Sequence, residues 1–187
     1  MINHETEIQT DTNETQQLRR DLQDGSSNDL WRRRAIINLS LVGIGAMAAA
    51  TLFQTGIIKH LPDPPIENFD ADAVTSSDVA YALGGADAVL SVASLAANVP
   101  AAAFGGEKRF TSTPLIPIAF AGKALAEAAI AGWFFYRMTT KEKKWCGYCI
   151  TNAAAIWGIA LLSARSEKSF CRIKRFAAEK LNHFNRN

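Results

Sequence analysis

Hydrophobic residues in this 187-residue chain gather into four blocks, and most charged residues lie between them. The first block, 35–58, runs for 24 residues without a charge, which is long enough to cross a bilayer core about 30 Å thick. The later blocks cover 86–104, 115–136 and 145–164. The pattern predicts an all-α fold in which four membrane-spanning helices form an integral membrane bundle.

The second block is the weakest of the predicted spans. It has 19 residues, with Asp87 near one end and Pro100 inside it. Pro100 lacks a backbone donor and is expected to kink the helix. An alternative is a helix that is buried in the bundle or lies at the membrane interface. Gly43 and Gly45 in the first block favour close packing between helices in either case.

Two polar segments flank the predicted membrane domain, 31–164. Residues 1–30 contain almost no large apolar side chains and are expected to be a disordered cytoplasmic tail. In 165–187, apolar residues on one helical stripe predict a basic amphipathic helix at an anionic lipid surface. The stripe consists of Phe170, Ile173, Ala177, Leu181 and Phe184. The alternative is a solvated helix that packs on the protein's own base.

The connection between the first two blocks, 59–81, is polar and acidic. It contains the rigid run Leu61-Pro62-Asp63-Pro64-Pro65, which cannot be helical. A short amphipathic helix is expected after it, over 76–83, with Ser76 or Ser77 as its N-cap.

Positive charges beside the predicted spans set their orientation. The arginines at 32–34 place the N-terminus in the cytoplasm, and four spans return the C-terminus to the same side. The basic loop predicted at 137–144 opposes this orientation, but the first helix usually dominates. We therefore expect the start of the fourth span at the outer face, where disulfides persist.

Charge and cysteine content exclude several classes of protein. The net charge of +2 gives no global field that would attract nucleic acid. Three cysteines are too few for a disulfide-dense secreted scaffold, and the polar N-terminus is unlike a secretory signal peptide. Two of the three cysteines stand close together, so the chemistry of the chain is expected there.

Cys146 and Cys149 form a C-x-x-C pair at the start of the fourth block. Thiols at i and i+3 share a helix face and can close a disulfide, while the helix start and the preceding Lys143 and Lys144 favour a thiolate. No second C-x-x-C or nearby histidine completes a zinc site, and Ile150 replaces the histidine that a c-type haem needs. The alternative to redox chemistry is a pair of buried cysteines that pack as small hydrophobic residues.

Ionisable residues within predicted spans are costly and usually face the bundle interior. Lys123 and Glu127, four residues apart in the third span, form either a proton path or head-group contact, or an ion pair that only fixes helix packing. Asp87 is either a partner of its helix dipole or a ligand contact. Tyr148, between the cysteines, is placed to flank a planar ligand. Aromatic residues at 133–136 are expected to form an interfacial belt.

Four spans with a C-x-x-C opening the last one resemble the vitamin K epoxide reductase family, over roughly residues 32–164. The similarity is strongest over Cys146-Gly147-Tyr148-Cys149 and the following Ile150-Thr151-Asn152-Ala153. The stretch 54–65 is similar to a bacterial branch of the family. Asp87-Ala88-Val89-Leu90-Ser91 stands where members carry Asn-Ser-x-x-Gly, with Asp in place of Asn and Ser in place of Gly.

The resemblance implies a membrane thiol–quinone oxidoreductase in a bacterial inner membrane, surrounded by membrane lipid. Its dithiol would reduce a menaquinone- or ubiquinone-like quinone without a metal, with Cys149 as the thiolate facing the quinone and Cys146 exchanging with another disulfide. The candidate quinone contacts are the residues singled out above from the sequence pattern itself: Asp87, Lys123, Glu127 and Tyr148. The family's second cysteine pair, in the first outer loop, is absent, because 59–85 contains no cysteine. An external thioredoxin-like thiol protein is therefore one expected partner.

Two other functions stay open. The missing loop pair and the small-residue helix faces also fit a non-catalytic quinone-binding or scaffold subunit of a membrane complex. A small transporter that uses Lys123 and Glu127 is disfavoured, because the chain is short and shows no inverted repeat.

Overall fold

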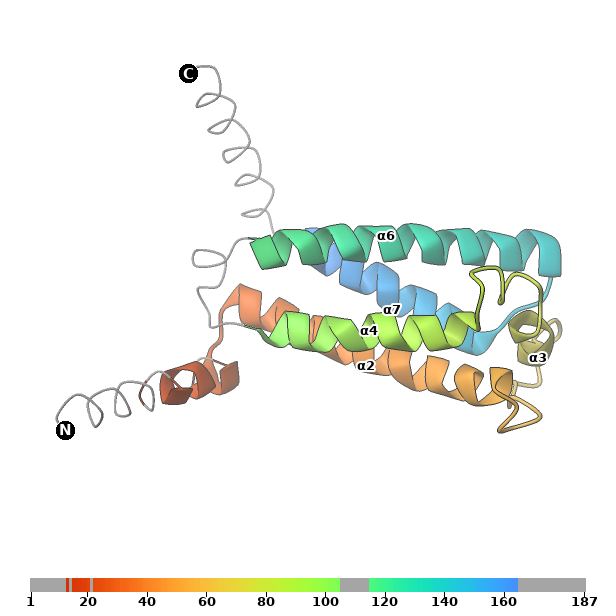
Figure 1. Ribbon diagram of the computed structural model, residues 1–187, viewed down its shortest axis with the longest axis horizontal. Coiled ribbons are helices and arrows are strands. Elements are labelled where there is room, and N and C mark those ends of the chain that lie inside the picture. The colour runs from red at the N-terminus through yellow and green to blue at the C-terminus, as the bar shows by residue number, and fades with distance from the viewer. Residues whose placement is uncertain (1–12, 14, 21, 105–114, 165–187) are drawn as a thin grey trace, which may run out of the picture.

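The computed structural model describes residues 13, 15–20, 22–104 and 115–164. In this part of the chain the fold is all-helical, without strands and with one isolated β-bridge. Four long helices lie side by side, and the short helix α3 sits at one end of them (Figure 1). The predicted all-α class is confirmed.

The long helices follow the four apolar blocks of the sequence. They are α2 (Asn28–Gln54), α4 (Asp87–Ala103), α6 (Leu115–Arg137) and α7 (Gly147–Ala164). The largest difference from the prediction is at the start of α2, which begins at Asn28 rather than at 35. Ser27 caps this helix, because its side chain accepts a hydrogen bond from the Leu30 N–H at 3.3 Å.

Three helical segments are long and apolar enough to cross a membrane. They are Asn28–Gln54, Ile118–Glu142 and Gly147–Ala164, whereas α4 is a shorter apolar helix of 17 residues. The described part of the chain is therefore all-helical with three candidate spans, and a bundle of four spans stays a prediction.

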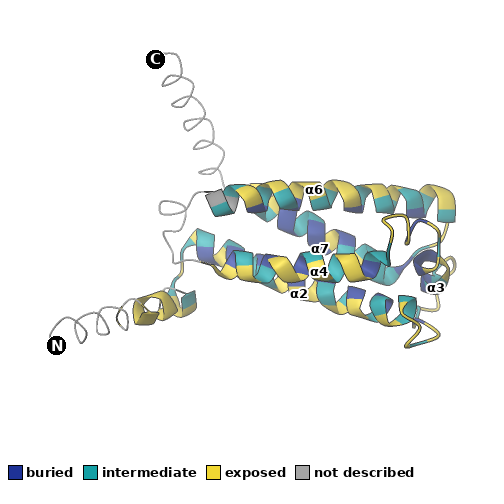
Figure 2. Cartoon of the chain, viewed as in Figure 1, coloured by how far each residue is buried: buried dark blue, intermediate teal, exposed yellow. Residues whose placement is uncertain are grey.

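Exposed helix faces carry large apolar side chains (Figure 2). Examples from three helices are Leu41, Val42, Leu125, Ile130 and Leu161. Such faces are unfavourable in water but suit contact with lipid, because a membrane requires only that the backbone polar groups be satisfied within the helices.

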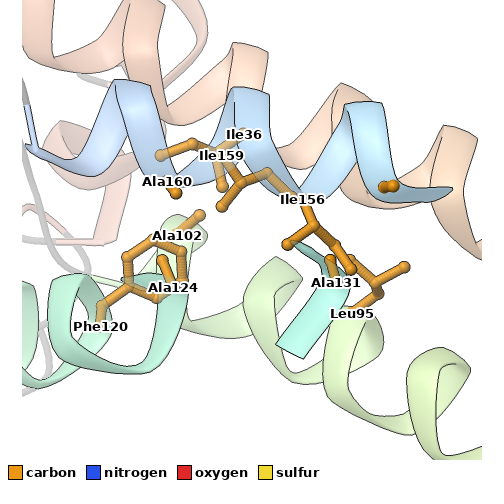
Figure 3. Close-up of a cluster of buried hydrophobic side chains, with 10 residues drawn as sticks. Ile36, Leu95, Ala102, Phe120, Ala124, Ala131, Ile156, Ile159 and Ala160 are labelled. Atoms are coloured by element: carbon orange, nitrogen blue, oxygen red, sulfur yellow. The ribbon is translucent and has the colours of Figure 1, made fainter. Parts of the chain in front are cut away.

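The buried interior is built largely from alanine and branched aliphatic residues. Ile156, Ile159 and Ala160 of α7 lie close to Phe120 and Ala124 of α6 (Figure 3). The close approach of α2 to α4 depends on the absence of a side chain at Gly43, as predicted. A Cβ there would stand 2.7 Å from Leu95 Cδ1 on α4, whereas a Cβ on Gly45 would meet nothing within 4 Å.

Two predictions about the connecting segments are wrong. The predicted helix over 76–83 is instead α3 (Ala71–Thr75), because Asp70 rather than a serine provides the N-cap, accepting from the Ala73 N–H at 3.0 Å. The predicted basic loop at 137–144 is helical for most of its length. A π-helical turn, η1 (Met138–Glu142), continues α6 and ends at Lys143, whose φ of 50° is left-handed.

The N-terminal segment is also more ordered than expected. Residues 15–20 and 22–24 are helical in the structure, whereas the sequence predicts a disordered tail over 1–30. The guanidinium of Arg34 donates to the carbonyls of Leu22 and Gln23 at 2.8 and 3.2 Å, which ties this segment to α2. The predicted amphipathic helix at 165–187 lies outside the described residues, as does the loop at 105–114.

Candidate active site

Cys146 and Cys149 lie at the start of α7, at the end of the bundle that carries α3. The Cys146 carbonyl accepts from the Ile150 N–H at 3.0 Å, and its Sγ accepts from the Cys149 N–H at 3.3 Å. Cys146 therefore occupies the N-cap of the helix. It is 0% exposed, whereas Cys149 is half-buried, and both are free thiols.

The two thiols differ in their environment. The pKa of the Cys146 thiol is lowered first by a hydrogen bond with the Cys149 thiol; burial acts in the opposite direction, and the Cys149 N–H adds to the lowering. Negative charge in the dithiol is therefore favoured on Cys146 rather than on Cys149, the thiolate that the resemblance implies.

A cavity of about 270 Å³ opens beside Cys149, bounded by α4, α6, α7 and the segment around α3. Its wall is mostly apolar and includes Leu95, Phe134 and Phe135. Nine polar or reactive side chains interrupt this wall: Thr75, Ser77, Asp87, Ser91, Ser94, Glu127, Glu142, Cys149 and Asn152. An apolar cavity with a few convergent polar groups is typical of a small-molecule site. Cys146 does not line it.

Asp87 is held at the mouth of the cavity by Gln54, the last residue of α2. The Gln54 amide donates to Asp87 Oδ1 at 2.7 Å and to the Thr75 carbonyl at 3.0 Å. Its oxygen accepts from the Ala88 N–H at 3.2 Å and so satisfies a free donor of the first turn of α4. Asp87 thus lies both at the start of its helix and in the cavity wall, and its contact with a ligand stays a prediction.

A polar cluster joins α6 to α4 deeper in the bundle. Lys123 Nζ donates to Glu127 Oε1 at 2.5 Å, to the Ser94 carbonyl at 2.9 Å and to Asn98 Oδ1 at 2.7 Å. The Ser94 hydroxyl also donates to Glu127. The predicted ion pair is therefore present and bridges two helices, while Glu127, but not Lys123, lines the cavity.

The polar residues of α4 lie on one helix face, which sequence reasoning had not connected. Asp87, Ser91, Ser94 and Asn98 follow the spacing i, i+4, i+7 and i+11, which places them one above another. Ser91 accepts from the Asn152 amide of α7 at 2.9 Å. A polar stripe on an otherwise apolar helix was the signal that could have identified Ser91, Ser94 and Asn98.

Gln54 was also missed as a site residue. The signal available in the sequence was its position as a polar side chain near the end of the uncharged first block. Its function depends on three contacts with segments that follow later in the chain, so its partners could not be read from its neighbours.

Tyr148 does not line the cavity. Its hydroxyl donates to the Pro62 carbonyl at 3.0 Å and so ties the outer loop to the start of α7. A contact of Tyr148 with a planar ligand stays a prediction. Among the aromatic residues at 133–136, Phe134 and Phe135 line the cavity, whereas Trp133 and Tyr136 are exposed.

Within the residues that the structure describes, no group of three or more His, Cys, Asp or Glu side chains is arranged to hold a metal ion.

Comparison with known proteins assigns the chain to a family. A family model described as the vitamin K epoxide reductase family matches residues 34–164. No curated protein matches the chain. The matched segment contains α4, α6 and α7, most of α2, and both cysteines of the site. The chain belongs to the vitamin K epoxide reductase family.

Proposed function

We propose that this protein is a membrane thiol–quinone oxidoreductase whose Cys146–Cys149 dithiol reduces a lipid-soluble quinone in the cavity beside Cys149. The observation that carries this proposal is that Cys149 lines a mostly apolar cavity among helices suited to a membrane. Family membership supports thiol–quinone chemistry in general. A flat apolar ring with polar oxygens matches an apolar wall that carries isolated polar groups.

The two thiols supply everything that quinone reduction requires. Both cysteines start as thiols; Cys149 Sγ attacks the quinone ring, and its proton passes to one ring oxygen. Cys146 Sγ then attacks Cys149 Sγ, the bond from Cys149 to the ring breaks, and the electron pair of that bond stays on the ring. The two protons lost by the thiols finish on the two ring oxygens. One disulfide and one hydroquinone result.

The polar cavity wall suits both redox forms of such a ring. Quinone oxygens only accept hydrogen bonds, so the suitable donor is the hydroxyl of Ser91, whose oxygen accepts from Asn152 and whose own proton is not used in that bond. Hydroquinone oxygens also donate, and the carboxylates of Asp87 and Glu127 are suitable acceptors. Lys123 keeps Glu127 paired and positioned, and acts on the quinone through it.

The proposed arrangement in the cell follows from this chemistry. All four long helices cross a bacterial inner membrane with both termini in the cytoplasm, and the cysteines lie at the outer end. A thioredoxin-like protein outside the membrane supplies electrons to the disulfide, since 59–85 contains no cysteine for an internal relay.

The proposal is tested by quinone reduction and thiol trapping in native membranes. Reduced protein is mixed with menaquinone or ubiquinone, and the fraction of the two cysteines in a disulfide is measured by alkylation. We expect disulfide to accumulate with quinol, and Cys149→Ser to abolish both. Cys171→Ser is the matched control and is expected to leave both unchanged. If Cys146 and Cys149 of the unmodified protein stay reduced with excess quinone, the proposal fails.

A non-catalytic quinone-binding subunit is the second candidate. Complete burial of Cys146 favours it, because a covered sulfur cannot exchange with a partner. It predicts that quinone binds, measured by quenching of tryptophan fluorescence, while both thiols stay reduced and Cys149→Ser has no effect. Thiol trapping therefore distinguishes the two candidates.

A further inference from the structure

The sulfur that must exchange with an outside partner is completely covered. Cys146 is 0% exposed and belongs to a buried cluster with Leu61, Ala71, Val74 and Met138. Three members of this cluster, Leu61, Ala71 and Val74, come from the outer loop and α3 rather than from the long helices. We call residues 61–75 the lid, since their removal would uncover the start of α7.

The lid is bound to the backbone of the residue before Cys146. The Trp145 N–H donates to the Asn68 carbonyl at 2.8 Å, and the Trp145 carbonyl accepts from the Asp70 N–H at 3.0 Å. These two bonds form the isolated parallel bridge between Phe69 and Trp145. Asn68 has a φ of 69°, a left-handed conformation that directs its carbonyl into the bridge at some conformational cost.

Only a few further contacts tie the lid to the bundle near the cysteines. The Tyr148 hydroxyl donates to the Pro62 carbonyl at 3.0 Å, and Lys144 Nζ lies 3.7 Å from Asp70 Oδ2. The ion pair is exposed and weak. The lid is thus held against the segment 144–148 by two backbone hydrogen bonds, one hydrogen bond from the Tyr148 hydroxyl and one ion pair.

We propose that the backbone edge of Trp145 is the docking site for an external protein dithiol, and that this partner displaces the lid. An extended segment beside the partner's reactive cysteine takes over the Trp145 N–H and carbonyl from Asn68 and Asp70. Such a segment pairs as an added strand and brings its sulfur next to Cys146. This inference rests on the proposed function, because it concerns how the 146–149 disulfide is reduced.

The exchange needs no reactant other than the partner's two thiols and the disulfide between Cys146 and Cys149. A partner thiolate attacks Cys146 Sγ of the disulfide, a mixed disulfide forms, and Cys149 leaves as a thiolate. The partner's second thiolate attacks its own first sulfur and releases Cys146. The partner is oxidised to a disulfide, the 146–149 pair is reduced, and the two protons of the partner's thiols are taken up by the cysteines released.

The first test measures access to Cys146 without quinone. Full-length protein carrying Cys149→Ser and Cys171→Ser is alkylated with a membrane-impermeant maleimide. We expect slow labelling, and an increase of about fivefold in Tyr148→Phe, because one hydrogen bond of the lid is lost. Tyr81→Phe is the matched control, since its hydroxyl lies 3.5 Å from the Gln54 carbonyl and does not touch the lid. Equal labelling rates in Tyr148→Phe and Tyr81→Phe would overturn the proposal, and so would fast labelling of the protein that carries neither tyrosine substitution.

The second test follows the two sides of the bridge by hydrogen exchange. Cys149→Ser protein is trapped as a mixed disulfide between Cys146 and a single-cysteine thioredoxin. We expect the Asp70 amide to lose protection, while the Trp145 amide stays protected by the partner. Protection of both amides would show that the lid has not moved, and exchange at both would show that nothing docks at Trp145. Each of these results contradicts the inference, and neither bears on whether quinone is reduced.

Discussion

Single polar side chains at the end of the bundle that carries α3 join segments that are far apart in the sequence. Gln54 links α2 to both Thr75 and Asp87, and Tyr148 links α7 to the outer loop. Inside the loop, the Asp72 carboxylate accepts from the Leu61 N–H at 2.8 Å and pairs with His60. Because each contact has a side chain as one partner, this end of the molecule is open to tests by point substitution.

The His60–Asp72 pair predicts a pH dependence of the outer loop. The pKa of His60 is raised above 6.5, first by its hydrogen bond with Asp72 and then by the charge of that carboxylate. The pair therefore stabilises the loop fully below about pH 6.5, and this contribution is lost as the pH rises through the folded-state pKa. NMR titration is expected to give a His60 pKa above 6.5 that falls in Asp72→Asn. An unchanged pKa would contradict this.

At the residue scale, the sequence indicated which side chains are reactive better than it indicated which residues they contact in the fold. The C-x-x-C pair, Asp87 and Glu127 could be found because ionisable or reactive side chains stand out in apolar blocks. That Cys149 lines the cavity while Cys146 is buried under the loop could not be found, since the difference depends on residues some 80 positions earlier in the sequence.

At the scale of elements, α4 is a short helix held at both ends by side chains of α2. Gln54 accepts from an N–H at its start. At its end, the Arg33 guanidinium donates to the carbonyls of Ala102 at 2.7 Å, Ala103 at 3.0 Å and Phe104 at 3.2 Å. These are carbonyls that a helix cannot satisfy internally, so α2 completes the hydrogen bonding of α4.

Replacing Arg33 should therefore weaken the α2–α4 pair. We expect Arg33→Gln to lower the free energy of unfolding in detergent micelles by about 1.5–3 kcal/mol, because charged hydrogen bonds to buried carbonyls are lost. Arg32→Gln removes the same charge beside the same span and is the control, with a change expected within about 0.5 kcal/mol. Equal losses in both variants would show that charge rather than capping is responsible.

The glycines of α2 give a second prediction at this scale. Gly43→Val would push a side chain against Leu95 and Asn152, at 2.7 and 3.3 Å from the added Cβ, so we expect a loss of about 1–3 kcal/mol in unfolding free energy. Gly45→Val meets open space and should cost much less. The comparison is made by unfolding both variants in the same micelles. A similar loss at Gly45 would mean that helix propensity, not packing, sets the effect.

Helix positions were predictable because apolar blocks and their ends are local features, and the bounds of α4, α6 and α7 differ from the prediction by at most two residues. The start of α2 and the position of α3 could not be predicted in this way. Both depend on which polar residue caps the helix, and Ser27 and Asp70 compete with many similar residues nearby.

At the scale of the whole molecule, α3 and the start of α7, which carries the cysteines, share one end of the bundle (Figure 1). The basic arginines of α2 and the helical N-terminal segment lie at the other end. This polarity is what the proposed topology requires, since one end must meet an external thiol protein and the other the cytoplasm.

The orientation predicts opposite accessibility for the two ends. In protein whose native cysteines are serine, Glu67→Cys should react with an impermeant maleimide in intact cells. Arg20→Cys should react only after the membrane is disrupted. Both positions are exposed, so the difference reports the side of the membrane rather than burial. Labelling of Arg20→Cys alone in intact cells would place the cysteines of the site in the cytoplasm.

The length of α4 has a consequence for the lipid around the protein. Seventeen residues rise about 25 Å, less than the roughly 30 Å of a bilayer core. In the proposed topology, acyl chains beside this helix must shorten or splay to avoid exposing its ends, whereas the 27 residues of α2 can tilt. Bilayer thickness would then change the strain on α4, which forms part of the wall of the proposed quinone cavity. Vesicles of graded acyl-chain length would vary that strain without altering a single residue.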